Sequence, residues 1–233
     1  MGESLQGQVA IVTGASGALG TEVTRSLIAA GATVVGIDRS STAAGSQAKD
    51  LHRVSANLTD PEDVRRALAK VTAEFKRIDV LVHVMGGFAG GASVAETDDA
   101  TWQKMMDMNL NAAFYVLRAV VPVMRQAEHG RIIVIGSRQA VQPAAGVGAY
   151  SASKAGLVSL VQTVALETKD KNIRANAILP GTMDTAANRA AMPKANFQKW
   201  VQPAHVAELV VMLAGDLGDE ITGAAIPVYG QDG

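Results

Sequence analysis

Residues 9–20 read Val9-Ala10-Ile11-Val12-Thr13-Gly14-Ala15-Ser16-Gly17-Ala18-Leu19-Gly20. The first four are apolar and stop short of a glycine, which predicts a buried parallel strand, and a helical pattern follows from about Thr21 to Ala30. A glycine-rich turn between a strand and a helix lets the backbone approach a pyrophosphate, which the free N–H groups of the helix then bind. The spacing is G-x-x-G-x-x-G and not the usual G-x-G-x-x-G. A plain turn would explain the glycines alone, but their place after the first strand favours a dinucleotide site.

Strands and helices are expected to alternate along the rest of the chain. The expected strands are 33–37, 51–57, 79–84, 131–135, 172–179 and 225–228, and the expected helices are about 61–75, 98–125, 148–170 and 203–214. Residues 182–203 look irregular, with a short helix near Trp200. This alternation predicts a single doubly wound, Rossmann-type α/β domain over residues 1–233, with a parallel seven-stranded sheet and helices on both faces.

Composition excludes several classes of function. Cysteine is absent, so there is no disulfide and no thiolate metal site. With 21 basic and 22 acidic residues, the formal net charge of −1 gives no general attraction to nucleic acid or anionic membranes. No apolar run approaches the roughly 20 residues that span a bilayer, and residues 1–8 do not resemble a signal peptide. We therefore expect a cytoplasmic protein. We also expect no metal site, because the four histidines, His52, His83, His129 and His205, lack metal-ligand spacing.

Asp38 ends the second expected strand, a little over twenty residues after the first glycine of the turn. A carboxylate there accepts hydrogen bonds from both hydroxyls of an adenosine ribose and repels a 2′-phosphate, which favours NAD(H). The neighbouring Arg39 can pair with that phosphate, so NADP(H) stays open. A surface turn would also explain an aspartate at this position.

Tyr150 and Lys154 are four residues apart, on one face of an expected helix. A lysine one turn away can lower the pKa of a phenol, about 10 ordinarily, and so allow proton transfer near neutral pH. Chance supplies this spacing in many chains. Two polar residues nearby favour the chemical interpretation: Ser137 follows the fifth expected strand, and Asn109 lies within an expected helix, where asparagine is unfavourable.

The sequence resembles the short-chain dehydrogenase/reductase family over nearly its whole length. The matching motifs occur in the family's order: Thr13-Gly14…Gly20, Asp38, Asp79-Val80-Leu81-Val82, Asn109, Ser137, Tyr150-x-x-x-Lys154, and Asn176 to Thr182.

The resemblance implies an NAD(H)-dependent oxidoreductase acting on a small carbonyl or alcohol. Tyr150 would exchange a proton with the substrate oxygen, which Ser137 would hold. Lys154 would bind the nicotinamide ribose and lower the pKa of Tyr150, and Asn109 would hold a water that relays protons. Besides Tyr150 and Lys154, the implied cofactor-binding residues are Gly14, Ser16, Gly17, Leu19, Asp38, Asn57, Leu58, Met85, Gly86, Pro180, Thr182 and Met183.

The sequence departs from the family pattern at three places. Ala18 stands where many members carry a second glycine of the turn. The usual Asn-Asn-Ala-Gly after the fourth strand is His83-Val84-Met85-Gly86, so the side-chain roles of those asparagines are lost. Asn57 replaces an aspartate that is common near the adenine.

Two alternative functions remain. The loop Gly86-Gly87-Phe88-Ala89-Gly90-Gly91 and parts of the tail from Ile178 to Trp200 are similar to quinonoid dihydropteridine reductases, which implies NADH-dependent pterin reduction. That family lacks the catalytic serine, so Ser137, with Asn109, favours carbonyl chemistry. The other alternative is a dinucleotide-binding sensor without turnover; such proteins commonly lose the tyrosine or the lysine, and both are present.

The substrate pocket is expected above the nicotinamide, with residues 182–203 as its lid. Met183, Met192, Phe197 and Trp200 would give this lid an apolar surface, unless they simply pack against the sheet. The helices at 98–125 and 148–170 carry wide apolar faces. Burial against the sheet would explain these faces, but the resemblance implies that they pair in a homodimer or homotetramer.

Overall fold

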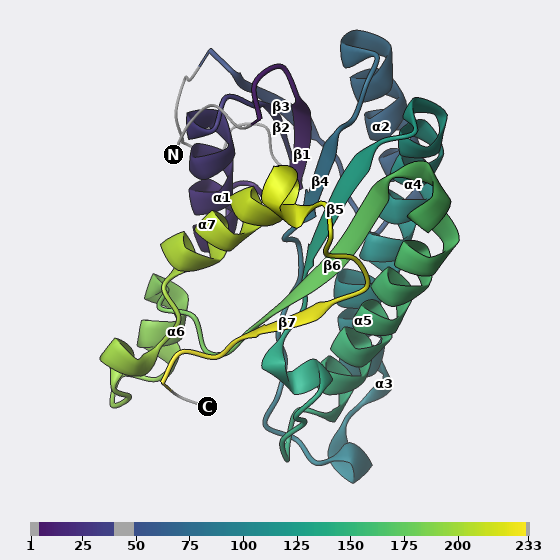
Figure 1. Cartoon of the computed structure of the whole chain (residues 1–233). Coiled ribbons are helices and arrows are strands. Elements are labelled where there is room, and N and C mark those ends of the chain that lie inside the picture. Colours follow the sequence, from purple (N-terminus) through teal and green to yellow (C-terminus); the bar gives the residue numbers. More distant parts are fainter. Residues whose placement is uncertain (1–4, 40–48, 232–233) are drawn as a thin grey trace.

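The computed structural model describes residues 5–39 and 49–231. Within these ranges seven strands form one parallel sheet in the order β3-β2-β1-β4-β5-β6-β7 (Figure 1). The predicted doubly wound, Rossmann-type fold is therefore confirmed. The strands are β1 (Val9–Thr13), β2 (Thr33–Asp38), β3 (Leu51–Ser55), β4 (Val80–His83), β5 (Gly130–Ile135), β6 (Ile173–Pro180) and β7 (Ala225–Val228).

Helices cover both faces of the sheet (Figure 1). Alternate residues of β1 show the two sides: Ala10 and Val12 pack with one group of helices, Val9 and Ile11 with the other. The first group is α1 (Ala18–Ala29) and α7 (Pro203–Ala214); the second is α2 (Pro61–Phe75), α4 (Ala112–Ala127) and α5 (Gly148–Thr168). No helix in the described ranges is long and apolar enough to cross a membrane.

Helix α1 begins at Ala18, three residues before the expected start, and two longer stretches differ more. The helix expected over 98–125 is three segments: α3 (Asp99–Met106), a π-turn over Asp107–Asn111, and α4. Such a turn adds a residue to the helix and is common at functional sites; this one contains Asn109. The stretch 182–203, expected to be irregular, contains α6 (Ala186–Ala191), whose first turn is capped by the Thr185 hydroxyl, and the short helix near Trp200 is a 3₁₀ turn over Phe197–Lys199.

The order of the strands fixes where a ligand can bind. From β1 the chain builds outward through β2 to β3, then returns across α2 to place β4 on the other side of β1. The connections after β1 and β4 therefore diverge and leave a crevice at the carboxyl ends of these strands, where open α/β sheets bind their ligands.

Candidate active site

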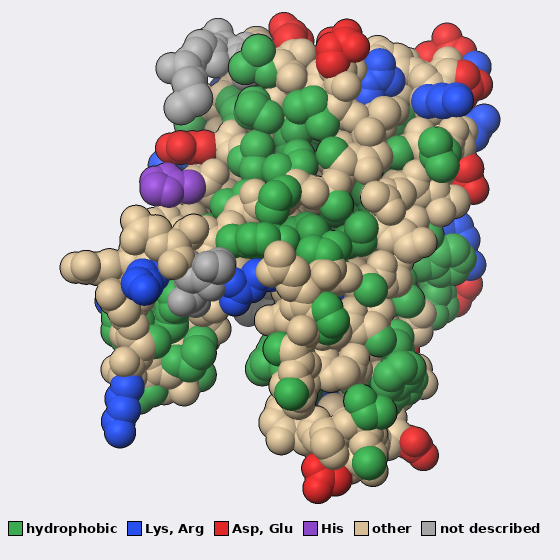
Figure 2. All heavy atoms as spheres, turned by 60° about the horizontal axis from the view of Figure 1, so that its bottom comes forward, with side chains coloured by type: hydrophobic (Ala, Val, Ile, Leu, Met, Phe, Trp, Pro, Cys, Tyr) green, Lys and Arg blue, Asp and Glu red, His purple; other side chains and the backbone are tan. Residues whose placement is uncertain are grey.

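A cleft of about 1010 Å³ lies at the carboxyl ends of β1, β2 and β4. Figure 2, which brings this end of the molecule forward, shows it hollowed between two projecting parts. The cleft brings together most of the residues expected to bind the cofactor, with Arg39 and part of α3 beside them. The expected residues that line it are Gly14, Ser16, Gly17, Leu19, Asp38, Asn57, Leu58, Met85, Gly86 and Met183.

Two glycines of the turn after β1 are required by close contacts. Gly14 has φ +68°, and a Cβ there would lie 3.0 Å from the Met85 nitrogen. At Gly20 a Cβ would lie 2.0 Å from the Gly14 carbonyl oxygen, so the start of α1 packs directly on the turn. Gly17 is the N-cap of α1, with an ordinary φ of −71°. The turn therefore exposes backbone and the N-terminus of a helix to the cleft, as a pyrophosphate site needs.

Asp38 lies at the end of β2, where its carboxylate accepts a hydrogen bond from the Ser16 N–H at 2.9 Å. This contact joins the carboxylate to the glycine turn on the same wall of the cleft. Asn57 and Leu58 follow β3 on this wall. The three residues surround the end of the cleft where a ribose and adenine would bind.

Pro180 and Thr182 do not line this cleft. Pro180 is the buried last residue of β6, and the Thr182 carbonyl accepts a hydrogen bond from the Val201 N–H at 2.9 Å. Met183, the next residue, does reach the cleft. The segment after β6 therefore meets the cleft through Met183 and Thr185.

Ser137 and Tyr150 meet beyond the end of β5. The Ser137 oxygen accepts a hydrogen bond from the Gln139 N–H at 3.2 Å, and the serine hydroxyl hydrogen-bonds with the phenol of Tyr150 in the first turn of α5. Burial raises the pKa of Tyr150, and the Ser137 hydrogen bond partly opposes that rise. The sequence predicted that Lys154 would lower this pKa, but burial is the largest influence on it and Lys154 is not among its causes.

Lys154 is buried one turn along α5, and its ammonium donates to the Ile135 carbonyl at 2.9 Å. Burial lowers the pKa of Lys154 to about 8, because an ammonium loses its water there. Gly86 lies against this group: a Cβ at Gly86 would be 3.1 Å from the lysine nitrogen and 2.8 Å from the Asn109 amide oxygen. Only a glycine lets the chain after β4 pass so close to both side chains.

Asn109 is fully buried on the π-turn. Its amide oxygen accepts from the Gly87 N–H at 2.9 Å, and its amide nitrogen donates to the Gly87 carbonyl at 3.1 Å and the Ser153 hydroxyl at 3.0 Å. The side chain thus ties the loop after β4 to α5. Ser153, which also donates to the Tyr150 carbonyl at 2.7 Å, was not singled out from the sequence.

His83 was assigned no role from the sequence, but it belongs to this centre. It is fully buried, and its Nδ1 lies 3.0 Å from the Thr13 hydroxyl, which also accepts from the Met85 N–H at 3.3 Å. Burial, with a smaller influence from the charge of Lys154, lowers the pKa of His83 to about 3. The ring is therefore neutral at ordinary pH. The signal in the sequence was a polar residue, His83, at the end of an otherwise apolar strand; in the sheet it pairs with Thr13 on the adjacent strand.

The substrate side of the site is apolar near Tyr150. Phe88 is 67 % exposed and meets the Tyr150 ring edge-on, with ring centroids 5.0 Å apart. The loop that carries Phe88 is held to the segment before α5 by a hydrogen bond from the Gly91 N–H to the Gly146 carbonyl at 2.7 Å. An exposed aromatic ring beside the phenol suits the wall of an open substrate pocket.

The expected lid is held together by its own contacts. Arg189 of α6 donates two hydrogen bonds to Asp184, at 2.5 and 2.7 Å, and its guanidinium lies 4.8 Å from the Phe197 ring centroid. Met192 is 41 % exposed, as a lid residue would be. Trp200 is only 5 % exposed, so for this residue packing in the protein interior is the correct interpretation.

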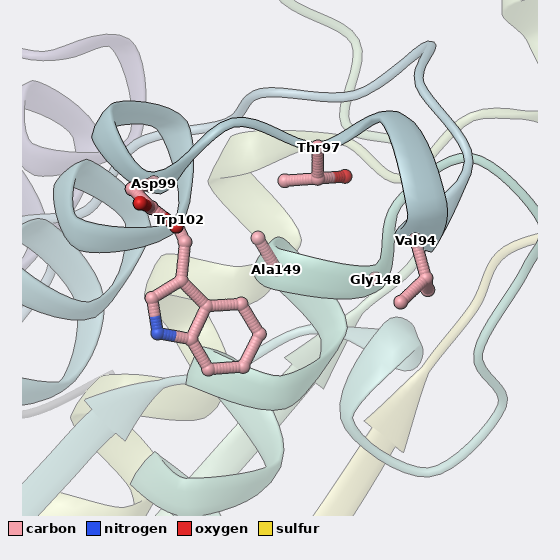
Figure 3. Close-up of a pocket in the computed structure, with 6 residues that line it drawn as sticks. All are labelled: Val94, Thr97, Asp99, Trp102, Gly148 and Ala149. Atoms are coloured by element: carbon pink, nitrogen blue, oxygen red, sulfur yellow. The ribbon is translucent and has the colours of Figure 1, made fainter.

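A second, smaller hollow of about 210 Å³ lies on the outer side of the site, where α5 begins (Figure 3). Trp102 of α3 and Val94 stand on either side of Gly148 and Ala149, and both side chains are exposed, at 46 % and 81 %. Thr97 and Asp99 complete a lining that is mostly apolar. Among the described residues, no group of three or more His, Asp or Glu side chains could hold a metal ion.

Comparison with known proteins agrees with this geometry. The family model for short chain dehydrogenases matches residues 8–196. The chain is 32 % identical to the 3-oxoacyl-[acyl-carrier-protein] reductase FabG of Escherichia coli strain K12 and 30 % identical to that of Thermotoga maritima; in both cases 97 % of this chain and 98 % of the relative are covered.

Solved structures give the same result. The crystal structure of gox2181 superposes with a TM-score of 0.92 at 30 % identity, covering 97 % of this chain and 96 % of that one. A short-chain type dehydrogenase/reductase from Mycobacterium ulcerans gives 0.90 at 26 % identity, covering 98 % and 90 %. The chain belongs to the short-chain dehydrogenase/reductase family of oxidoreductases.

Proposed function

We propose that the protein is an NAD(H)-dependent oxidoreductase that interconverts a small carbonyl compound and its alcohol. The observation that carries the proposal is the hydrogen bond between Ser137 and Tyr150, placed beside a cleft that fits a dinucleotide. Two hydroxyl groups joined in this way can both reach one substrate oxygen. The bound cofactor would supply or accept the hydride.

The residues present fit that cofactor. Gly14 and Gly20 have no room for a Cβ, so the backbone of the turn can approach a pyrophosphate at the N-terminus of α1. Asp38 would accept hydrogen bonds from the adenosine ribose and repel a 2′-phosphate, which supports NAD(H) over NADP(H). Arg39, which also lines the cleft, is the residue that would favour NADP(H) instead.

Ser137 and Tyr150 would act on the substrate oxygen. Because the Gln139 N–H already donates to the serine oxygen, the serine can donate its own proton to the substrate. In reduction, Tyr150 would donate a proton to the oxygen as the carbonyl carbon accepts the hydride; in oxidation it would take that proton back. Lys154 would bind the nicotinamide ribose, and its charge would stabilise the phenolate formed during turnover.

Asn109 would support this centre and hold a water that relays protons from Lys154. The Gly87 and Ser153 contacts use the amide N–H groups of its side chain and one lone pair of the amide oxygen, so we expect the water on the main chain of the π-turn. The side chain itself would fix the loop after β4 against α5.

The experiment is a screen of ketones, aldehydes, alcohols and quinonoid dihydropterin with each cofactor, followed by Tyr150→Phe on the best substrate. We expect a loss of at least about 10²-fold in kcat, the scale of general acid catalysis. Tyr115→Phe, which removes a phenol on α4 away from the cleft, is the matched control. Full activity in Tyr150→Phe would refute the proposed proton transfer.

Pterin reduction is the second candidate, supported by the loop that presents Phe88 beside Tyr150, where a flat ring can stack. Ser137→Ala separates the two candidates. A carbonyl reductase should lose activity with this change, whereas reduction of a quinonoid dihydropterin should not need the serine. NADH binding without turnover on any substrate in the screen would favour a sensor instead.

We also propose that the protein forms a homodimer or homotetramer through α4 and α5. Phe114 of α4 is 41 % exposed, with the Arg118 guanidinium 5.1 Å from its ring centroid, and Leu166 of α5 is 70 % exposed. Sedimentation of the wild type and of Phe114→Glu would test it: the variant should shift toward monomer.

A further inference from the structure

Phe88 is held at a defined place although 67 % of it is exposed. Just before it, the N–H and the carbonyl of Gly87 both bind the buried side chain of Asn109, at 2.9 and 3.1 Å. Shortly after it, the Gly91 N–H donates to the Gly146 carbonyl at 2.7 Å. An exposed phenylalanine is not unusual by itself. A loop fixed at both ends, however, limits the positions that this ring can take.

The ring of Phe88 contacts two parts of the protein. A Cβ added to Gly90 would lie 3.0 Å from the Phe88 Cζ and 2.8 Å from the Val147 Cγ1, so the tip of the ring lies close to the glycine backbone. The ring also meets the Tyr150 ring edge-on, with centroids 5.0 Å apart and planes at 74°. Aromatic pairs of this geometry are favourable. These contacts leave a free aromatic surface next to the phenol.

The contacts described for the phenol are with uncharged groups. Burial and then the Ser137 hydrogen bond influence the pKa of Tyr150, and no charged side chain of the described residues is among the causes. Arg138, which directly follows Ser137, lies over the Tyr229 ring, 5.8 Å from its centroid. A charged substituent placed against Phe88 would lose hydration at an apolar surface. A flat, uncharged ring could stack there instead.

We propose that Phe88 is a specificity-determining residue, which selects carbonyl substrates with an uncharged aromatic ring joined directly to the reacting carbon. The inference rests on the proposed carbonyl chemistry, in which Tyr150 binds the substrate oxygen. A ring on the reacting carbon stays beside Tyr150, and therefore beside Phe88, because the two side chains are in contact. A ring carried on a longer, flexible chain would not be held to this surface.

The first test compares acetophenone with cyclohexyl methyl ketone, whose six-membered rings are similar in size but differ in aromaticity. Phe88→Leu keeps an apolar side chain and removes the aromatic one. We expect it to lower the ratio of kcat/KM for the aromatic ketone to that for the saturated ketone by at least about fivefold, mainly through KM. Phe88→Tyr should restore the ratio. Phe114→Leu makes the same change at an exposed phenylalanine that does not line the cleft, and is the control.

The second test needs no turnover. Benzamide and cyclohexanecarboxamide differ in the same way as the two ketones, and their dissociation constants with the NADH-loaded protein can be measured by NMR titration. The wild type should prefer benzamide, and Phe88→Leu should lower that preference by at least about fivefold. No preference in the wild type, or one that Phe88→Leu leaves unchanged, would overturn the proposal. If the preference changes as expected but no carbonyl compound is turned over, the proposed function fails and the aromatic site stands.

Discussion

Lowering the pH should destabilise this protein through His83. The folded chain holds the pKa of His83 at about 3 against an ordinary value of 6.5, because a charged ring in the interior would lose its hydration. Between these two values the unfolded chain binds a proton at this residue and the folded chain does not. Stability from this group is therefore complete above pH 6.5 and is lost as the pH falls toward 3.

The magnitude follows from the gap between the two values. One pH unit corresponds to about 1.4 kcal/mol, so at pH 5 the His83 contribution to the free energy of unfolding should be smaller by about 2 kcal/mol, and near pH 3 by about 4 kcal/mol. The ring is fully buried, so solvent screening does not reduce this figure. A loss of about 2 kcal/mol is large, because the free energy of unfolding of a typical domain is on the order of 5–15 kcal/mol.

The assay is urea unfolding followed by circular dichroism at pH 7, 6 and 5. Wild type and His83→Asn should differ in slope, with the variant losing about 2 kcal/mol less between pH 7 and 5. His129, whose pKa burial also lowers, is present in both proteins and cancels in the comparison. His205→Asn removes an exposed histidine as the control. Parallel pH dependences for wild type and His83→Asn would refute the reasoning.

Three further predictions concern the cofactor cleft and the lid. Asp38→Ala should reduce the ratio of kcat/KM with NAD to kcat/KM with NADP by at least about tenfold, which corresponds to the free energy of one charge-assisted hydrogen bond. An unchanged ratio would show that Asp38 does not bind the ribose. Gly20→Ala should lower both thermal stability and NADH affinity, because the new Cβ would lie 2.0 Å from the Gly14 carbonyl oxygen. Gly17→Ala is the matched control, because its Cβ would lie 3.4 Å from the same oxygen. Equal effects of the two substitutions would contradict this reasoning. Asp184→Asn should speed tryptic cleavage within residues 186–199, because it weakens the contacts of Asp184 with Arg189 and Gln202. These contacts lower the pKa of Asp184 to about 2, so in the wild type they should persist on acidification until the pH approaches 2. An unchanged cleavage rate in the variant would show that these contacts do not hold the lid.

The sequence by itself determined the order of the elements and predicted which residues form the site. The glycine turn, the strand ends at Asp38 and Ser137, and the spacing of Tyr150 and Lys154 depend on near neighbours in the chain, so local patterns predict them. Helix α7 and strand β7 begin and end where the sequence predicted. Proline and glycine set such boundaries through their own backbone preferences.

Only the tertiary structure decided the contacts between distant segments. Thr13 and His83 are 70 residues apart and meet because β1 and β4 are neighbours. The π-turn at Asn109 places an amide that binds Gly87 and Ser153, and no helical periodicity predicts that extra residue. The direction of the Tyr150 pKa was likewise decided by burial. Desolvation depends on everything that packs around a group, whereas spacing along the chain reports only its near neighbours.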